Sequence, residues 1–164
     1  MAEFKNLADL TKEYIEWDPN EECRNAIKSG QVNLENVLRN RLAFGTAGLR
    51  GPMGAGYNRM NELVVLQTTQ GLADFYKDTQ ETKSVIIGYD HRCLGTLSSK
   101  GFARISAAVF LSMGWKVYML EKLLATPFVA YGVTHFKCLL GIMVTASHNP
   151  KADNGFKVRT LDEI

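Results

Sequence analysis

Short segments suited to β-strands alternate with longer segments of helical periodicity over most of this chain. Four segments are expected to form strands: 44–50, 85–89, 115–120 and 139–145. Three other segments carry apolar side chains at helical spacing: 62–77, 97–113 and 126–136. Strands that alternate with helices favour parallel pairing. We therefore predict an α/β fold, a three-layer α/β/α sandwich with a mostly parallel four-stranded sheet.

The first forty residues show a helical pattern only. Apolar side chains between residues 4 and 14 lie at the spacing of one helix face. Two shorter helices are expected to follow, one that ends at Gly30 and one capped by Asn33. We predict that residues 1–40 form an N-terminal helical extension without chemistry of its own, packed on a domain of residues 41–164.

The bulk properties exclude several classes of protein. The net charge of +2 over 164 residues is too small to indicate a nucleic-acid or membrane-surface partner. No apolar run approaches the roughly 20 residues of a membrane span, and the first residues lack the apolar core of a signal peptide. Three widely spaced cysteines suit neither a disulfide framework nor a zinc site. These features predict a cytoplasmic protein.

A polar loop follows the last of the apolar strands. Ser147 and His148 come just after the carboxyl end of that strand, where open α/β sheets place their ligands. The sequence Asp-Asn-Gly at 153–155 indicates a turn, and residues 156–158 alternate as a short returning strand. The chain is therefore expected to bring Lys157 back to the neighbourhood of Ser147.

This loop contains the groups that phosphoryl transfer requires. A serine hydroxyl can carry a phosphoryl group if nearby cations neutralise the phosphate and another group handles the proton. His148, Lys151 and Lys157 supply such groups within one loop. A serine and histidine pair by itself would more simply indicate an ordinary polar turn without a catalytic role. Ser147 lies in no G-x-S-x-G elbow, and the chain has no G-x-x-x-x-G-K-[ST] loop, so esterase and nucleotide triphosphatase functions have little support.

A glycine-rich segment at 44–56 is the second candidate site. Its glycines allow the backbone to approach a ligand closely, and the guanidinium of Arg50 is suited to bind phosphate through two hydrogen bonds. Taken alone, a solvated arginine in a glycine-rich loop is about as good an interpretation. The order of the glycines does not match the G-x-G-x-x-G fingerprint of dinucleotide-binding proteins.

Both segments resemble characteristic motifs of the α-D-phosphohexomutases. The loop at 145–157 resembles T-A-S-H-N-P followed by N-G-x-K, and 44–51 resembles F-G-T-[AS]-G-x-R-G. Residues 88–92 resemble the G-x-D-x-R segment, to which we assign a supporting role. The resemblance covers about 41–158 and implies the α/β/α domain that is the first of four in that family.

The resemblance implies the following roles. Ser147 is the phosphorylated serine, and its phosphate also touches Mg²⁺. His148 and Lys157 lie at the reacting hydroxyl, with Lys157 as the general acid and base, and Arg50 faces the phosphoserine or the phosphosugar. Seven residues are implied in binding the substrate or its phosphate: Thr46, Gly48, Arg50, Ser147, Asn149, Lys151 and Asn154.

Within the family, residues 44–50, 59–61 and 67–71 look most like the phosphoglucomutase-2 branch, which includes phosphopentomutase and glucose-1,6-bisphosphate synthase. This implies an isomerase that moves phosphate within glucose 1-phosphate, ribose 1-phosphate or deoxyribose 1-phosphate. The phosphoserine would donate to one hydroxyl, and a sugar bisphosphate such as glucose 1,6-bisphosphate would be the intermediate or activator.

The chain also departs from the family. It contains no D-G-D-x-D-R metal loop, sugar-specificity loop or phosphate-binding loop, so the remaining magnesium ligands are absent. We expect a fragment or truncated form that is inactive or nearly so by itself. Two alternatives stay open: another phosphohexomutase, such as a phosphomannomutase, and a non-catalytic domain that binds phosphosugars or partners.

Overall fold

One mixed five-stranded sheet forms the centre of the molecule. The computed structural model describes residues 5–46, 48–79 and 81–160. The strand order is β1-β7-β6-β2-β5. The strands are β1 (Gly48–Pro52), β2 (Ser84–Tyr89), β5 (Lys116–Met119), β6 (Leu140–Val144) and β7 (Asp153–Thr160). Strand β2 pairs in parallel with β5 and β6, whereas β7 is antiparallel to both β6 and β1.

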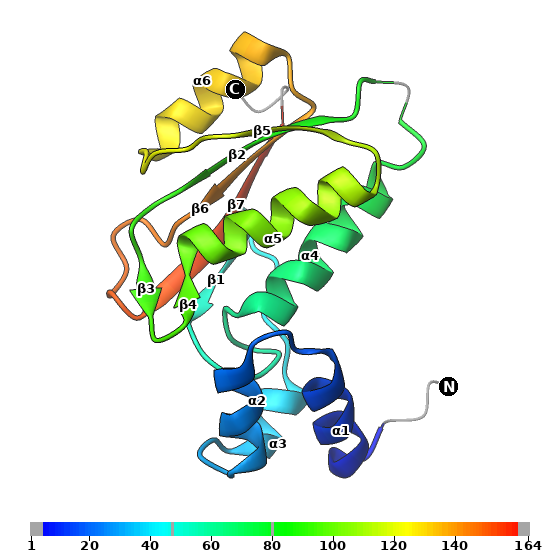
Figure 1. Ribbon diagram of the computed structural model, residues 1–164, viewed down its shortest axis with the longest axis vertical. Coiled ribbons are helices and arrows are strands. Elements are labelled where there is room, and N and C mark those ends of the chain that lie inside the picture. Colours follow the sequence, from blue (N-terminus) through cyan, green and yellow to red (C-terminus); the bar gives the residue numbers. More distant parts are fainter. Residues whose placement is uncertain (1–4, 47, 80, 161–164) are drawn as a thin grey trace.

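Helices cover both faces of this sheet, which confirms the predicted three-layer α/β/α class. Helices α4 (Glu62–Phe75) and α5 (Ser99–Ser112) pack together on one face, and α6 (Thr126–Phe136) covers the other (Figure 1). Strand β2 is buried along its whole length, as expected for a strand covered on both sides. A small hairpin, β3 (Cys93–Leu94) and β4 (Leu97–Ser98), lies between β2 and α5.

The sheet has one strand more than predicted. Strands β5, β2, β6 and β1 correspond to the four expected segments and run in one direction, because β1 and β6 are both antiparallel to β7. The fifth strand, β7, is the returning segment, and it is longer than the three residues expected. It lies between β6 and β1, so its backbone groups are paired on both sides.

The expected turn at 153–155 was wrong, because these residues begin β7 and the turn lies at 147–152. The Asn154 side chain is fully buried and donates to Ser99 Oγ at 2.9 Å. A Cβ atom at Gly155 would lie 2.6 Å from the carbonyl oxygen of Thr145. Buried hydrogen bonding and close backbone approach therefore account for an Asn-Gly pair that usually marks a turn.

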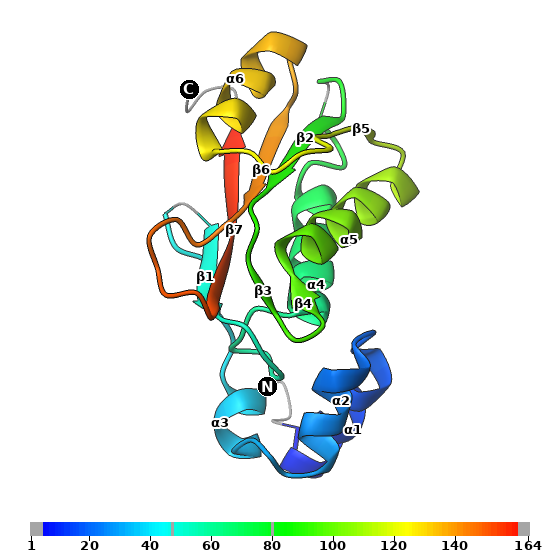
Figure 2. The ribbon, with the colours of Figure 1, turned by 60° about the vertical axis from the view of Figure 1, so that its left-hand side comes forward.

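The N-terminal extension consists of α1 (Leu7–Trp17), α2 (Glu21–Lys28) and α3 (Leu34–Arg39). An asparagine side chain caps each helix: Asn6, Asn20 and Asn33. The three helices lie at one end of the sheet domain (Figures 1 and 2). Tyr14 is fully buried there, and its hydroxyl accepts a hydrogen bond from the Gly56 backbone at 2.9 Å. Residues of the extension share one hydrophobic cluster with the sheet and α4–α5, so the extension is packed firmly on the domain.

Within the described parts of the chain, no helix has the length and apolar character needed to cross a bilayer. All three cysteines are free; Cys23 and Cys138 are buried, and Cys93 is exposed.

Candidate active site around Ser147

Ser147 lies at the start of the loop that joins β6 to β7. Its φ angle is +55°, in the left-handed region that residues other than glycine seldom adopt. Its backbone N–H donates to Thr145 Oγ1 at 3.0 Å, and its side chain is exposed. We call residues 145–153 the serine loop. A strained backbone conformation at an exposed serine is a feature that often accompanies function.

Two cations from separate strands lie at this loop. The register of β7 places Lys157 opposite Met143 of β6 and Gly48 of β1, and its ammonium donates a hydrogen bond to Ser147 Oγ. Arg50 lies opposite Gly155, so its side chain shares a sheet face with that of Lys157. The expected return of Lys157 to Ser147 is confirmed.

Arg50 contacts the serine loop directly. Its Nη1 donates to Asn149 Oδ1 at 3.0 Å, and Asn149 Nδ2 donates in turn to Asp153 Oδ2 at 2.9 Å. Arg50 is exposed, so its guanidinium retains donors for a ligand. A phosphate on Ser147 would therefore meet an ammonium and a guanidinium that the fold has already placed.

The electrostatics of Lys157 favour proton exchange. Partial burial lowers the pKa of its ammonium, and the nearby cations Arg50 and Arg159 lower it further. Arg159 follows Lys157 by two positions along β7 and therefore points to the same face. A lower pKa makes the ammonium a better proton donor.

Arg92 stabilises the serine loop through its backbone. The sequence indicated a supporting role for this segment without identifying its contacts. Its guanidinium donates to four backbone carbonyls of the loop, those of Ser147, Asn149, Pro150 and Asp153, at 2.8, 3.0, 2.7 and 2.9 Å. Arg92 is only 9% exposed. Since carbonyl groups converge on it, this side chain fixes the path of the loop and thereby the direction of Ser147.

Asp90 in turn fixes Arg92. Its Oδ2 accepts from Arg92 Nε at 3.1 Å and from Thr145 Oγ1 at 2.6 Å, and its Oδ1 accepts from Ser99 Oγ at 2.6 Å. Burial alone would raise the pKa of Asp90, but the hydrogen bonds from Ser99 and Thr145 and the charge of Arg92 outweigh it and lower the pKa. Asp90 is therefore a carboxylate that supports the loop.

The other expected site residues have different surroundings. His148 and Lys151 are exposed, and neither forms a hydrogen bond or ion pair with the described part of the chain. Asn154 was expected to bind the ligand, but its side chain is fully buried beneath the loop. This burial follows from its position at the start of β7, where its amide bonds to Ser99.

Gly48 pairs with Lys157 across β1 and β7, whereas Thr46 lines a separate hollow. A Cβ atom at Gly48 would come within 2.0 Å of the Phe156 carbonyl oxygen, so glycine is required there for β1 to approach β7. Thr46 lines a hollow together with Leu72, Phe75 and Val158. Val158 alternates with Lys157 along β7, so Thr46 lies on the opposite face of the sheet. Its expected contact with substrate remains a prediction.

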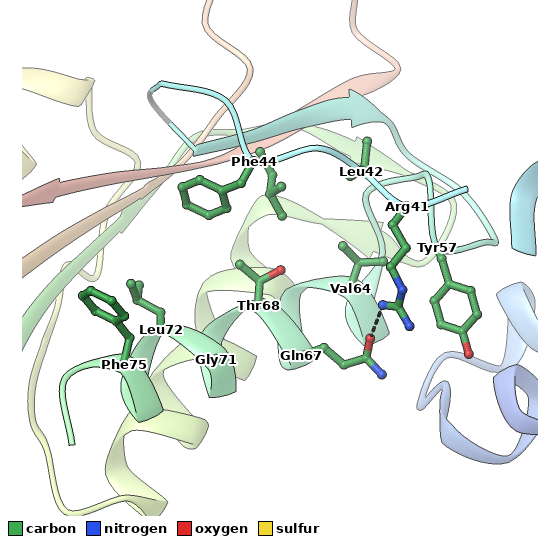
Figure 3. A pocket seen from close by; sticks show the side chains of 11 residues that line it. Arg41, Leu42, Phe44, Tyr57, Val64, Gln67, Thr68, Gly71, Leu72 and Phe75 are labelled. Carbon is green, nitrogen blue, oxygen red and sulfur yellow. Dashed lines mark hydrogen bonds between the residues drawn. The ribbon is translucent and has the colours of Figure 1, made fainter. Parts of the chain in front are cut away.

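A larger groove of about 380 Å³ runs along α4 on that same opposite face (Figure 3). The Arg41 guanidinium lies 4.5 Å from the centre of the Tyr57 ring and donates to Gln67 Oε1 at 3.1 Å. Leu49 lines this groove, whereas its neighbour Arg50 points to the face of Lys157. The groove is therefore separate from the site around Ser147.

The described side chains do not form a magnesium site by themselves. Over residues 5–46, 48–79 and 81–160, no three His, Cys, Asp or Glu residues are grouped closely enough to hold a metal ion. Both oxygens of Asp90 already accept hydrogen bonds, and Asp153 Oδ2 accepts one from Asn149. Magnesium prefers several oxygen ligands, which these two carboxylates do not supply.

Comparisons with known proteins agree with this architecture. Residues 41–163 match the family model described as phosphoglucomutase/phosphomannomutase, alpha/beta/alpha domain I. A phosphopentomutase of Mus musculus is 43% identical over 163 residues, which cover 93% of this chain and 26% of that protein. A phosphoribomutase of Saccharomyces cerevisiae is 46% identical over 135 residues, or 80% of this chain and 21% of that protein.

Two further matches have related names. A glucose 1,6-bisphosphate synthase of Mus musculus is 39% identical over 89% of this chain and 25% of that protein. A solved structure from Thermus thermophilus, described as that of a phosphomannomutase, has a TM-score of 0.65 at 28% identity and covers 74% of this chain and 26% of that chain. The chain thus spans only about a quarter of the length of the relatives that it matches.

Proposed function

Because this chain belongs to the phosphoglucomutase/phosphomannomutase family as its α/β/α domain I, we propose that Ser147 carries the phosphoryl group of a sugar-phosphate mutase. The observation that carries the proposal is the hydrogen bond from the Lys157 ammonium to Ser147 Oγ. Arg50, bound to Asn149, adds a second positive charge to the same loop. A lone serine in a turn requires neither group.

The proposed reaction has two halves. In the first, the bond between phosphorus and Ser147 Oγ breaks, the phosphoryl group passes to a sugar hydroxyl, and the Lys157 ammonium protonates the departing Oγ. The exposed His148 accepts the proton of the sugar hydroxyl. In the second half, Ser147 Oγ attacks the other phosphate of the sugar bisphosphate while neutral Lys157 accepts the proton of the Ser147 hydroxyl. The bond between that phosphorus and the sugar oxygen breaks, and protonated His148 returns its proton to the sugar oxygen. Arg50 neutralises charge on the phosphoryl group in both halves.

The proposed substrates are sugar 1-phosphates. Ribose 1-phosphate and deoxyribose 1-phosphate are suggested by relatives named phosphopentomutase and phosphoribomutase, and glucose 1-phosphate with glucose 1,6-bisphosphate by the relative named for that synthase. The proposal applies to the protein that contains this domain. Lys151, exposed in the serine loop, is proposed to contact the substrate phosphate. A cytoplasmic location is proposed because all three cysteines are free.

The resemblance to the family implies Mg²⁺, which would neutralise charge on the transferred phosphate, but the side chains of the described residues do not complete a site for it. We propose that the isolated 164-residue chain has little or no turnover. A coupled assay of the purified chain with glucose 1-phosphate, Mg²⁺ and glucose 1,6-bisphosphate tests this, and robust activity would contradict it.

The phosphoserine assignment is tested by intact mass spectrometry of the protein that contains this domain, after incubation with glucose 1,6-bisphosphate. One covalent phosphate is expected in the unaltered protein and none in Ser147→Ala. Ser29→Ala, an exposed serine of the extension, is the matched control and should retain the phosphate. A phosphate that persists in Ser147→Ala would overturn the assignment. A protein that binds sugar phosphates without ever becoming phosphorylated would be a binding domain instead.

A further inference from the structure

The N-terminal extension reaches the serine loop through one short hairpin. The β3–β4 hairpin starts directly after Arg92 and ends directly before Ser99. Both ends belong to the support of the serine loop: Ser99 N donates to the Arg92 carbonyl at 2.9 Å, and Ser99 Oγ donates to Asp90 at 2.6 Å. The hairpin therefore joins the residues that hold the Arg92 guanidinium beneath Ser147.

The tip of this hairpin is attached to α2 of the extension. Glu22 Oε2 accepts hydrogen bonds from the backbone N–H of Thr96 at 2.9 Å and from its hydroxyl at 2.8 Å. Asn20 Nδ2 donates to the same hydroxyl at 3.0 Å. The bonds from Thr96, backbone first, lower the pKa of Glu22, so it is a carboxylate when it holds the hairpin. Residues 93–96 are otherwise exposed.

Helix α2 and the hairpin approach each other closely at the turn of the hairpin. Gly95 has a φ of +56°, and a Cβ atom there would lie 2.6 Å from both carboxylate oxygens of Glu22. A side chain at this position would displace the Glu22 carboxylate and would adopt a left-handed backbone conformation that residues other than glycine seldom take. At its other side, the extension is fixed to the domain where Tyr14 accepts from Gly56. The extension thus has a rigid base from which α2 can hold the hairpin.

We propose that the N-terminal extension is a positioning element for Ser147, and that Glu22 and Thr96 are its positioning residues. Neither residue touches the serine loop. Together they hold the hairpin, the hairpin holds Arg92, and Arg92 holds the four carbonyls that set the direction of Ser147. The catalytic part of this inference rests on the proposed function, whereas the ordering of the loop does not.

Hydrogen exchange of the 164-residue chain tests the ordering of the loop. Glu22→Gln combined with Thr96→Val removes the charge and the hydroxyl while nearly preserving side-chain size. Exchange of the amides of the serine loop should rise about three- to tenfold, the scale of one lost hydrogen bond, while α6 exchanges as before. Glu21→Gln, which neutralises an exposed carboxylate in the same helical turn, is the control and should change neither segment. Loop exchange equal to that of the control would overturn the proposal.

Kinetics of the protein that contains this domain test the consequence for the reaction. The double variant should lower kcat by about three- to tenfold at nearly constant KM, because a small displacement of the nucleophile affects the transition state more than binding. Thr96→Ser, which keeps the hydroxyl, should keep kcat. A rise in KM alone, or equal loss in Thr96→Ser and Thr96→Val, would contradict a positioning role. Ser147→Ala, measured in parallel for covalent phosphate, tests the proposed function separately.

Discussion

The ammonium of Lys157 donates a hydrogen bond to the hydroxyl of Ser147, across a loop that separates the two residues by ten positions. The contact exists because β7 returns antiparallel beside β6 and places Lys157 opposite Met143. The serine loop then folds back over the end of the strand pair. Sheet register therefore fixes the position of Lys157, and the serine loop brings the Ser147 hydroxyl to it.

Removing the ammonium should slow phosphoryl transfer strongly. We expect Lys157→Met to lower the single-turnover rate by about 10²- to 10⁴-fold, the range typical of general acid–base catalysis. Lys157→Arg keeps a charge but exchanges protons poorly, so it should recover little of the rate. Lys122→Met, an exposed lysine of the β5–α6 connection, is the control. A rate within about threefold of the unaltered protein in Lys157→Met would show that another group moves the proton.

Arg159 should influence the pH dependence of that step. A cation beside an ammonium disfavours the charged form and lowers its pKa, so Arg159→Gln should raise the pKa of Lys157. The limb of the pH–rate profile that reports Lys157 should move to higher pH. The control is Arg104→Gln, at an exposed position of α5, which should leave the pH–rate profile unchanged. An unshifted limb in Arg159→Gln would mean that Arg159 does not act on Lys157.

Asp90 should make stability depend on pH in the acid range. Its pKa is lowered below its ordinary value of 3.8, so the unfolded chain takes up this proton at higher pH than the folded chain does. The stabilisation is complete above that ordinary value and is lost as pH falls through the lower pKa of the folded protein. Asp90→Asn should cost about 2–3 kcal/mol of unfolding free energy at neutral pH, and less as the pH falls.

Denaturant unfolding of the unaltered protein and of Asp90→Asn across the acid range measures this difference in unfolding free energy. Asp74→Asn, in an exposed pair with Lys77, should change the unfolding free energy by less than about 1 kcal/mol. A deficit in Asp90→Asn that stays constant down to the lowest pH would argue against a charged Asp90.

Two glycines should respond to alanine in opposite ways. Gly48→Ala places a Cβ atom 2.0 Å from a backbone carbonyl at a φ of +112° and should lower the unfolding free energy by about 2–4 kcal/mol. Gly71→Ala, in α4, meets no atom within 4 Å and should raise stability by about 0.5–1 kcal/mol, because glycine weakens a helix. Thermal or urea unfolding of the two variants decides this, and a Gly48→Ala protein of normal stability would refute the close packing of β1 on β7.

Local sequence patterns were sufficient to predict most helices, the strands along the parallel part of the sheet, and the serine loop. The asparagine before an apolar periodic segment predicted a helix start at Asn33, and the structure confirms it. Ser147, Lys157 and Arg50 were identifiable because their motifs are unusual strings of residues. Each of these signals is contained within a few consecutive residues.

Only the tertiary structure determined which strands pair and which residues contact one another. The place of β7 between β6 and β1, the burial of Asn154 and the opposite face of Thr46 all follow from strand pairing. Arg92 reaches the carbonyl of Ser147, 55 positions away, and Glu22 reaches Thr96 across 74 positions. Periodicity records which side of an element is apolar, but it contains no information on which backbone groups will lie opposite a given side chain. That is set only when the strands pair in register and the helices pack on them.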